Sequence, residues 1–186
     1  MLVMKHNQIK SAIEFLQQGK VIAFPTETVY GLGCDPRDAK AVKQIVRLKG
    51  RPKDKSLLLV ASSFAQVREV AVLRGPALTL AKKYWPGPLS LILPAKHKKG
   101  TVGIRISSSP IVQKLTRGFG FPIIATSANR SGEEPARSTE EVLKIFGKRI
   151  PFVINGGKLI KRKSSTLVRC HDDGTIEIRR QGAIRL

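Results

Sequence analysis

The chain has 186 residues, of which 41% are hydrophobic, and carries 34 lysines and arginines against 13 aspartates and glutamates. A chain of this length can form a hydrophobic core that needs no disulfide or metal to stabilise it. Two cysteines are also too few for a disulfide framework or a four-ligand zinc site. The net charge of +21 favours nucleic acid or phosphorylated ligands as partners, because such a field attracts polyanions over about a Debye length. A gain in solubility alone is the other explanation for this charge.

No stretch reaches the roughly 18 uninterrupted apolar residues of a membrane span. Residues 1–10 also lack an apolar signal core followed by small residues. We therefore expect a cytoplasmic protein with no membrane partner.

Apolar residues at helical spacing, bounded by capping or breaking residues, predict the helices. Asn7 and Gly19 bracket the first of them, and Ser138 with Glu141 forms a capping box for the last. The expected helices are residues 8–18, 37–49 and 75–84, a segment after Pro110, and a segment from Ser138 to near Phe146.

Short apolar runs between the helices predict strands. The expected strands are residues 21–24, 57–61, 89–94, 102–107, 122–126, 152–155, 165–169 and 176–180. Helices and strands alternate, but the late strands lack helices between them, which indicates an α/β fold with one large mixed, partly antiparallel sheet flanked by helices. No linker or repeat divides the chain, so we expect residues 1–186 to form a single domain.

Familiar catalytic and nucleotide-binding patterns are missing from the sequence. It contains no G-x-x-x-x-G-K-[ST], and the glycines around Gly31 do not fit G-x-G-x-x-G. His6, His97 and His171 are far from one another along the chain. We therefore expect neither a histidine metal site nor a Cys-His nucleophile pair.

Residues 25–33 follow the first predicted strand and concentrate hydroxyl, carboxylate and phenol groups. Loops that follow strands often carry function, which makes this segment a candidate site. A plain turn between β-favouring residues would give a similar composition.

Residues 49–55 end the second predicted helix with a cluster of cations. Gly50 breaks the helix and Pro52 stiffens the chain beyond it, so Lys49 and Arg51 can converge on one ligand. A guanidinium fork and an ammonium point charge are complementary around a triphosphate. A solvated basic turn is the alternative.

Residues 125–132 (ATSANRSG) follow another apolar strand. Hydroxyl and amide groups at the carboxyl end of a strand suit binding of phosphate or ribose oxygens.

Residues 85–88 (WPGP) impose a rigid turn, which we interpret as a structural corner with Trp85 in the core.

Four segments together resemble the YrdC family of threonylcarbamoyl-AMP synthases: residues 24–32, 49–52, 85–89 and 126–132, in family order within a similarity over about residues 8–185. The resemblance implies the YrdC-like fold and a reaction of L-threonine, bicarbonate and ATP to give threonylcarbamoyl-AMP and pyrophosphate. The product supplies N6-threonylcarbamoyladenosine in tRNAs that read codons starting with A.

The resemblance also implies the site residues. Those implied for ATP binding are Lys49, Arg51, Ser127, Asn129, Ser165 and Arg180. Lys49 and Arg51 are in addition the expected catalytic cations, and Thr28 and Tyr30 are implied for the threonine pocket.

One departure concerns longer relatives, which carry His-Pro where this chain has Lys55-Ser56 and continue into a further C-terminal domain. The chain is therefore similar to the short bacterial form. That form acts with separate proteins that transfer the threonylcarbamoyl group to tRNA, and we expect such partners here.

The implied chemistry brings three anions together and needs cations more than a nucleophile. Like charges about 4 Å apart repel by about 4 kcal/mol at an effective dielectric constant of 20. We expect Mg²⁺ to be held mainly by the phosphates of ATP, and we assign no metal-ligating residue. Glu27 is the nearest carboxylate, but it could equally well hydrogen-bond its own loop.

Between Lys148 and Arg169 the chain carries seven basic residues and no acidic one. Those at Lys158, Lys161, Arg162 and Lys163 fall in a predicted loop, where they could bind the backbone of tRNA or double-stranded RNA. A non-catalytic protein that binds double-stranded RNA or the ribosome is therefore the alternative function.

Overall fold

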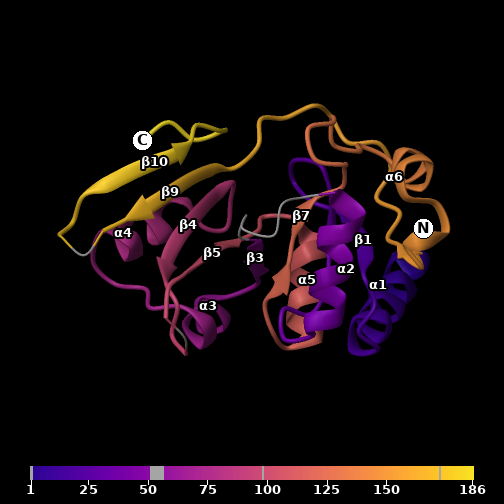
Figure 1. The fold of residues 1–186 in the computed structure, drawn as a ribbon, viewed down its shortest axis with the longest axis horizontal. Coiled ribbons are helices and arrows are strands. Elements are labelled where there is room, and N and C mark those ends of the chain that lie inside the picture. The colour runs from indigo at the N-terminus through magenta and orange to yellow at the C-terminus, as the bar shows by residue number, and fades with distance from the viewer. Residues whose placement is uncertain (1, 51–56, 98, 172) are drawn as a thin grey trace.

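The computed structural model describes residues 2–50, 57–97, 99–171 and 173–186, in which strands form two mixed sheets covered by helices (Figure 1). The predicted contribution of Arg51 and the departure at Lys55-Ser56 lie outside the described residues. The helices are α1 (Leu2–Gln17), α2 (Ala39–Lys49), α3 (Phe64–Val70), α4 (Gly75–Tyr84), α5 (Pro110–Phe119), α6 (Thr139–Phe146) and the 3₁₀ helix η1 (Gly147–Arg149). None of these described helices combines the length and apolar character needed to cross a bilayer.

A four-stranded sheet has the order β7-β2-β1-β8. Its strands are β1 (Ile22–Pro25), β2 (Tyr30–Gly33), β7 (Thr126–Ser127) and β8 (Phe152–Val153). β1 pairs antiparallel with β2 and parallel with β8, and β2 pairs antiparallel with β7.

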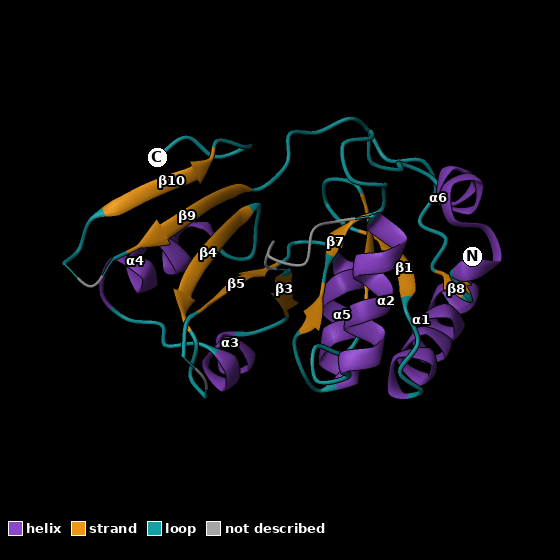
Figure 2. Cartoon of the chain, viewed as in Figure 1, coloured by secondary structure: helices purple, strands orange, loops and turns teal. Residues whose placement is uncertain are grey.

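A six-stranded sheet has the order β10-β9-β4-β5-β3-β6. Its strands are β3 (Leu58–Ala61), β4 (Leu89–Pro94), β5 (Thr101–Ile106), β6 (Ile123–Ile124), β9 (Thr166–Cys170) and β10 (Ile176–Arg180). The β3–β5 and β4–β9 pairs are parallel and the others are antiparallel. Figure 2 shows this sheet on the left and the four-stranded sheet on the right.

Residues 123–127 join the two sheets. Within this short segment β6 pairs with β3 of one sheet and β7 pairs with β2 of the other. Between the two pairings, the backbone N–H of Ala125 donates to the carbonyl oxygen of Leu58 at 2.9 Å. A Cβ at Gly33 would collide with the carbonyl oxygen of Ile124, so the close approach of β2 to this segment requires glycine.

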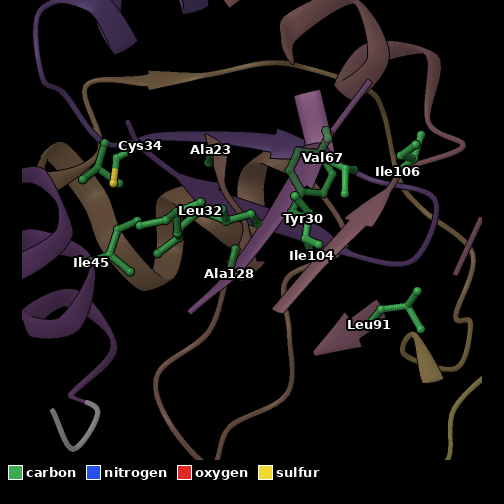
Figure 3. Packing of buried hydrophobic residues seen from close by; sticks show 14 of the residues in the cluster. Ala23, Tyr30, Leu32, Cys34, Ile45, Val67, Leu91, Ile104, Ile106 and Ala128 are labelled. Atoms are coloured by element: carbon green, nitrogen blue, oxygen red, sulfur yellow. The ribbon is translucent and has the colours of Figure 1, made fainter. Parts of the chain in front are cut away.

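The main hydrophobic core runs through both sheets. It extends from Ile45 on α2 through Leu32 on β2 to Ile104 and Leu91 in the six-stranded sheet, and all four side chains are fully buried (Figure 3). A second cluster packs α1 and α5 against β1. Burial across both sheets fixes their relative position, and this position determines where polar groups at the strand ends meet.

Trp85 confirms the interpretation of the WPGP segment as a structural corner. Its side chain belongs to the main core at 6% exposure, and its ring tilts against that of Phe64 at a centroid distance of 5.9 Å. Its Nε1–H donates to the carbonyl oxygen of Leu89 at 2.7 Å, so the one polar group of the indole is satisfied.

The expected fold class is confirmed: the fold is α/β, with mixed and partly antiparallel strands flanked by helices. The strands are divided between two sheets, however, where one large sheet was expected. The predictions also omitted β2 and α3, ran the segment 122–126 as one strand, and made the strand at 152–155 longer than β8. The assignment of residues 1–186 to a single domain stays a prediction.

Candidate active site

A cavity of about 520 Å³ lies where the two sheets meet. Its wall combines the β1–β2 loop and β2 of the four-stranded sheet with β3, β4 and β5 of the six-stranded sheet. The end of α2, the loop after β7, the segment before β9 and the end of β10 complete it. This volume is within the range of small-molecule sites.

Seven of the eight predicted site residues line this cavity, and the eighth, Arg51, lies outside the described residues. The seven are Thr28, Tyr30, Lys49, Ser127, Asn129, Ser165 and Arg180. They come from segments up to 152 positions apart in the chain, from Thr28 to Arg180, so folding brings them together as expected. Their individual roles stay predictions.

Lys49 occupies the last position of α2. Asp38 begins this helix by accepting hydrogen bonds from the backbone N–H groups of Lys40 and Ala41, and Gly50 ends it in a left-handed conformation with φ of 58°. Since both ends of the helix are fixed by local sequence, the direction in which Lys49 leaves the helix is fixed as well.

The ammonium group of Lys49 contacts Ser127 and Asn129, two other predicted site residues. Its Nζ donates to the carbonyl oxygen of Ser127 at 2.6 Å and to that of Asn129 at 3.0 Å, and it lies 3.2 Å from Asn129 Oδ1. In turn Asn129 Nδ2 donates to the carbonyl oxygens of Arg130 and Glu133 at 2.8 Å. Lys49 therefore brings a positive charge to the wall and organises the loop after β7.

The β1–β2 loop is held by Thr26. Its Oγ1 accepts hydrogen bonds from the backbone N–H groups of Thr28 and Val29 and donates to the carbonyl oxygen of Val29 at 2.8 Å. The hydroxyl oxygens of Thr26 and Thr28 are 3.0 Å apart. These contacts make the hydroxyl-rich loop a compact turn and fix Thr28 at the cavity.

The phenol of Tyr30 forms hydrogen bonds with the segment that follows β8 and crosses between the sheets. Its hydroxyl accepts a hydrogen bond from the backbone N–H of Gly156 and donates to the carbonyl oxygen of Gly157, both at 2.9 Å. That segment runs from the α6 side of the molecule to β9 (Figure 1). Tyr30 therefore lines the cavity while its hydroxyl is engaged with the protein.

Arg180 and Ser165 contact each other at the cavity wall. The Arg180 guanidinium donates to the Ser165 carbonyl oxygen from Nε at 3.1 Å and from Nη2 at 3.0 Å, and Nη2 also donates to Ser165 Oγ. Ser165 Oγ lies 3.0 Å from Ser90 Oγ. Burial lowers the pKa of Arg180 from its usual value, and the positive charge of Arg105 lowers it further.

Arg105 is a cavity residue that sequence reasoning missed. It lies on β5, its side chain is 10% exposed, and its Nη1 is 2.9 Å from Glu27 Oε1. Burial lowers the pKa of Arg105, and the charge of Glu27 opposes this shift. An arginine inside an apolar predicted strand was the signal that could have revealed it, because charged residues are almost never fully buried unless paired.

From the sequence, Glu27 could be either the carboxylate nearest to Mg²⁺ or a hydrogen-bonding partner of its own loop. Its Oε1 pairs with Arg105, and its Oε2 accepts a hydrogen bond from Ser107 Oγ at 2.6 Å. Both partners belong to the six-stranded sheet or the turn that follows it, outside the loop of Glu27 itself.

The cavity carries a strong excess of positive charge. Among the described residues that line it, Glu134 is the only acidic one. The basic ones are Lys49, Arg105, Arg137, Lys161, Arg162 and Arg180. Such a cavity is suited to polyanions, since bound negative charge offsets the mutual repulsion of the cations.

Cysteine chemistry does not fit this site. Burial raises the pKa of the Cys34 thiol to about 12, with smaller contributions from Asp35 and Asp38, so almost none of it is thiolate near neutral pH. Cys170 and His171 are neighbours in the chain, but both line a smaller cavity beside α4. The arrangement at the main cavity can bind and orient anions.

Comparison with known proteins gives consistent matches over nearly the whole chain. The family model Sua5_yciO_yrdC, described as telomere recombination, matches residues 14–182. The threonylcarbamoyl-AMP synthase of Vibrio campbellii is 35% identical over 184 residues, covering 93% of this chain and 98% of the relative. That of Halorhodospira halophila is 39% identical over 158 residues, covering 80% and 83%.

Among solved structures, Sua5 of P. abyssi in complex with L-threonine superposes with a TM-score of 0.87 at 37% identity. The match covers 94% of this chain but 54% of the Sua5 chain, so this chain spans about half the length of that protein. With the family model and the two full-length relatives, these matches show that the chain belongs to the Sua5/YciO/YrdC family.

Proposed function

We propose that this protein is a threonylcarbamoyl-AMP synthase, a nucleotidyltransferase that makes threonylcarbamoyl-AMP and pyrophosphate from L-threonine, bicarbonate and ATP. The observation that carries the proposal is the electropositive cavity in which predicted residues from five segments of the chain converge. The names of the full-length relatives and the L-threonine complex of Sua5 support it.

The reaction consists of two displacements. The threonine amine attacks the carbon of bicarbonate, with loss of water, or the carbon of the CO₂ in equilibrium with it, with loss of a proton from nitrogen. Either route gives an N-carboxylate, a carbamate. A carbamate oxygen then attacks the α-phosphorus of ATP while the bond to the bridging oxygen of pyrophosphate breaks. Both substrates of the second step are anions, so the protein contributes mainly orientation and positive charge.

The residues would divide this work between two groups. Thr28 and Tyr30, from the four-stranded sheet, are proposed to line the threonine pocket. For ATP the proposed residues are Lys49, Arg51, Ser127, Asn129, Ser165 and Arg180, with Lys49 and Arg51 also acting in catalysis. Arg105 adds a further, largely buried cation to the same cavity, where it could offset the charge of an anionic part of a substrate.

Magnesium fits this site through the nucleotide. Glu134 is the one carboxylate among the described residues of the wall, which is a poor donor set for a protein-held ion. Phosphate oxygens would supply most of the ligands, and the ion would neutralise charge on the triphosphate. Proteins that pass the threonylcarbamoyl group to tRNA would act after release of the product, in the cytoplasm.

The direct test incubates the pure protein with ATP, L-threonine and ¹³C-labelled bicarbonate. We expect a labelled threonylcarbamoyl-AMP, identified by mass, together with pyrophosphate. Omission of threonine is the control and should abolish both products. If ATP binds with measurable affinity but no adenylate forms, the synthase proposal is wrong and the RNA-binding alternative gains support.

Binding of tRNA or double-stranded RNA is proposed as a second property of the same protein. Lys158, Lys161, Arg162 and Lys163 are all exposed in the segment that crosses between the sheets. Phosphate contacts release counterions, so we expect the logarithm of the RNA affinity to fall linearly with the logarithm of salt concentration.

A charge variant tests this surface. Replacing Lys158 and Lys163 by glutamine should reduce the salt slope by about 1 to 2, measured by fluorescence anisotropy with a labelled RNA duplex. The matched control replaces Lys82 and Lys99, two exposed lysines outside the segment, and should change the slope less. Equal effects in both variants would show that only net charge matters and that this segment is not the binding surface.

A further inference from the structure

Glu27 and Arg105 form a buried pair across the joint between the sheets. Glu27 lies in the loop between β1 and β2, and Arg105 lies on β5. Their side chains are 9% and 10% exposed, and Oε1 of the carboxylate is 2.9 Å from Nη1 of the guanidinium. Among the described residues, Arg105 lines the cavity and Glu27 does not, so the carboxylate lies behind the guanidinium.

The carboxylate is itself held in place. Ser107 Oγ donates to Glu27 Oε2 at 2.6 Å, and the same Oγ accepts a hydrogen bond from the backbone N–H of Ser109 at 3.2 Å. Gln113 Nε2 donates to the carbonyl oxygen of Ser107 at 2.6 Å. Because Ser109 is the cap residue of α5, the orientation of Glu27 depends on a fixed helix start.

Arg105 needs this carboxylate to stay where it is. Among the described residues, Glu27 is the acidic partner of Arg105. Arg180 adds a second positive charge to the wall of the same cavity. Burial lowers the pKa of both guanidiniums, and the charge of Arg105 lowers that of Arg180 further. Without Glu27, desolvation and repulsion from Arg180 would both drive the Arg105 guanidinium away from the wall.

We propose that Glu27 is a positioning residue, which holds the Arg105 guanidinium at the cavity wall so that its remaining N–H groups face an anionic group of a substrate. The chemistry that matches this planar fork is a carboxylate, a carbonate or a phosphate. Glu27 then acts on the ligand only through Arg105. The inference rests on the proposed function and assigns within it a residue whose role the sequence left open.

A double-mutant cycle tests this dependence. Glu27→Gln, Arg105→Ala and the double variant are compared with the wild-type protein, with KM and kcat measured for each substrate in turn. We expect Glu27→Gln to raise KM for an anionic substrate about 10-fold or more, because a charge-assisted contact is lost. In the Arg105→Ala background the same change should alter that KM less than about 2-fold. Equal effects in both backgrounds would overturn the proposal.

Equilibrium titrations separate this proposal from the proposed function. The four proteins are titrated separately with L-threonine and with ATP, which needs no turnover. Non-additive losses of affinity for either ligand support the positioning role even if the wild-type protein makes no product. Additive losses, or no loss with both ligands, contradict it.

Two further variants guard against a merely structural effect. Ser107→Ala removes the 2.6 Å hydrogen bond to Glu27 and the 3.2 Å hydrogen bond from the Ser109 N–H but keeps both charges, so it should fold even if Glu27→Gln does not. We expect it to raise the same KM about 3-fold, with kcat unchanged and no effect in the Arg105→Ala background. The matched control is Glu177→Gln, which breaks an exposed pair with Arg179 and should leave every KM unchanged.

Discussion

Replacing Lys49 by alanine should abolish pyrophosphate release in the presence of threonine and bicarbonate, with a loss on the order of 100- to 1,000-fold or more in kcat. The variant loses a buried positive charge at the cavity and the donor that joins the oxygens of Ser127 and Asn129. The loop after β7 would then lose its side-chain contacts with Lys49 and keep the backbone hydrogen bond from the N–H of Ser131 to the carbonyl oxygen of residue 49. A coupled assay for pyrophosphate measures the effect.

The matched control for this variant is Lys43→Ala, on the exposed side of the same helix. It changes the net charge by the same amount and should keep near-normal turnover. Circular dichroism should show an intact fold for both proteins, since α2 keeps its cap at Asp38 and its end at Gly50. Near-normal turnover of Lys49→Ala would show that the catalytic role has been assigned to the wrong residue.

Replacing Trp85 by alanine should lower the free energy of unfolding by about 3 to 5 kcal/mol. The side chain is almost fully buried in the main core, packs against Phe64, and donates from Nε1 to the carbonyl oxygen of Leu89. Its removal leaves a large void and an unsatisfied carbonyl oxygen at the start of β4. Unfolding in urea, followed by circular dichroism, measures the change.

Trp85→Phe is the comparison that separates volume from hydrogen bonding. It keeps much of the aromatic packing but loses the indole N–H, so we expect a loss smaller than that of the alanine variant. Equal stability of wild type and Trp85→Ala would mean that this corner does not support the core. Because Trp85 is absent from the wall of the main cavity, KM values should change little in the folded protein.

Several site residues could be predicted because each stands where the local sequence marks the end of a helix or strand. Lys49 ends a helix that Gly50 breaks, and Ser127 and Asn129 follow an apolar strand, so each appears in the sequence at the end of an element. The structure places all three within one hydrogen-bonded group. The motifs shared with the YrdC family include the same three positions.

Arg105 has one local signal, a charge inside an apolar strand, but its role at the site depends on tertiary contacts. Along the chain it is one more cation in a strongly basic protein. It becomes a site residue only through Glu27, 78 positions earlier, and Arg180, 75 positions later. The division into two sheets was missed for the same reason, since nothing local shows that residues 123–127 pair on both sides of Ala125.

The shared segment 123–127 also limits how this protein can diverge. A residue inserted there would shift the register of β6 against β3 or of β7 against β2, and side chains on the shifted strand would change faces. Both halves of the cavity would be affected by a single change in length. We therefore expect relatives to keep the length of this stretch even where its side chains differ.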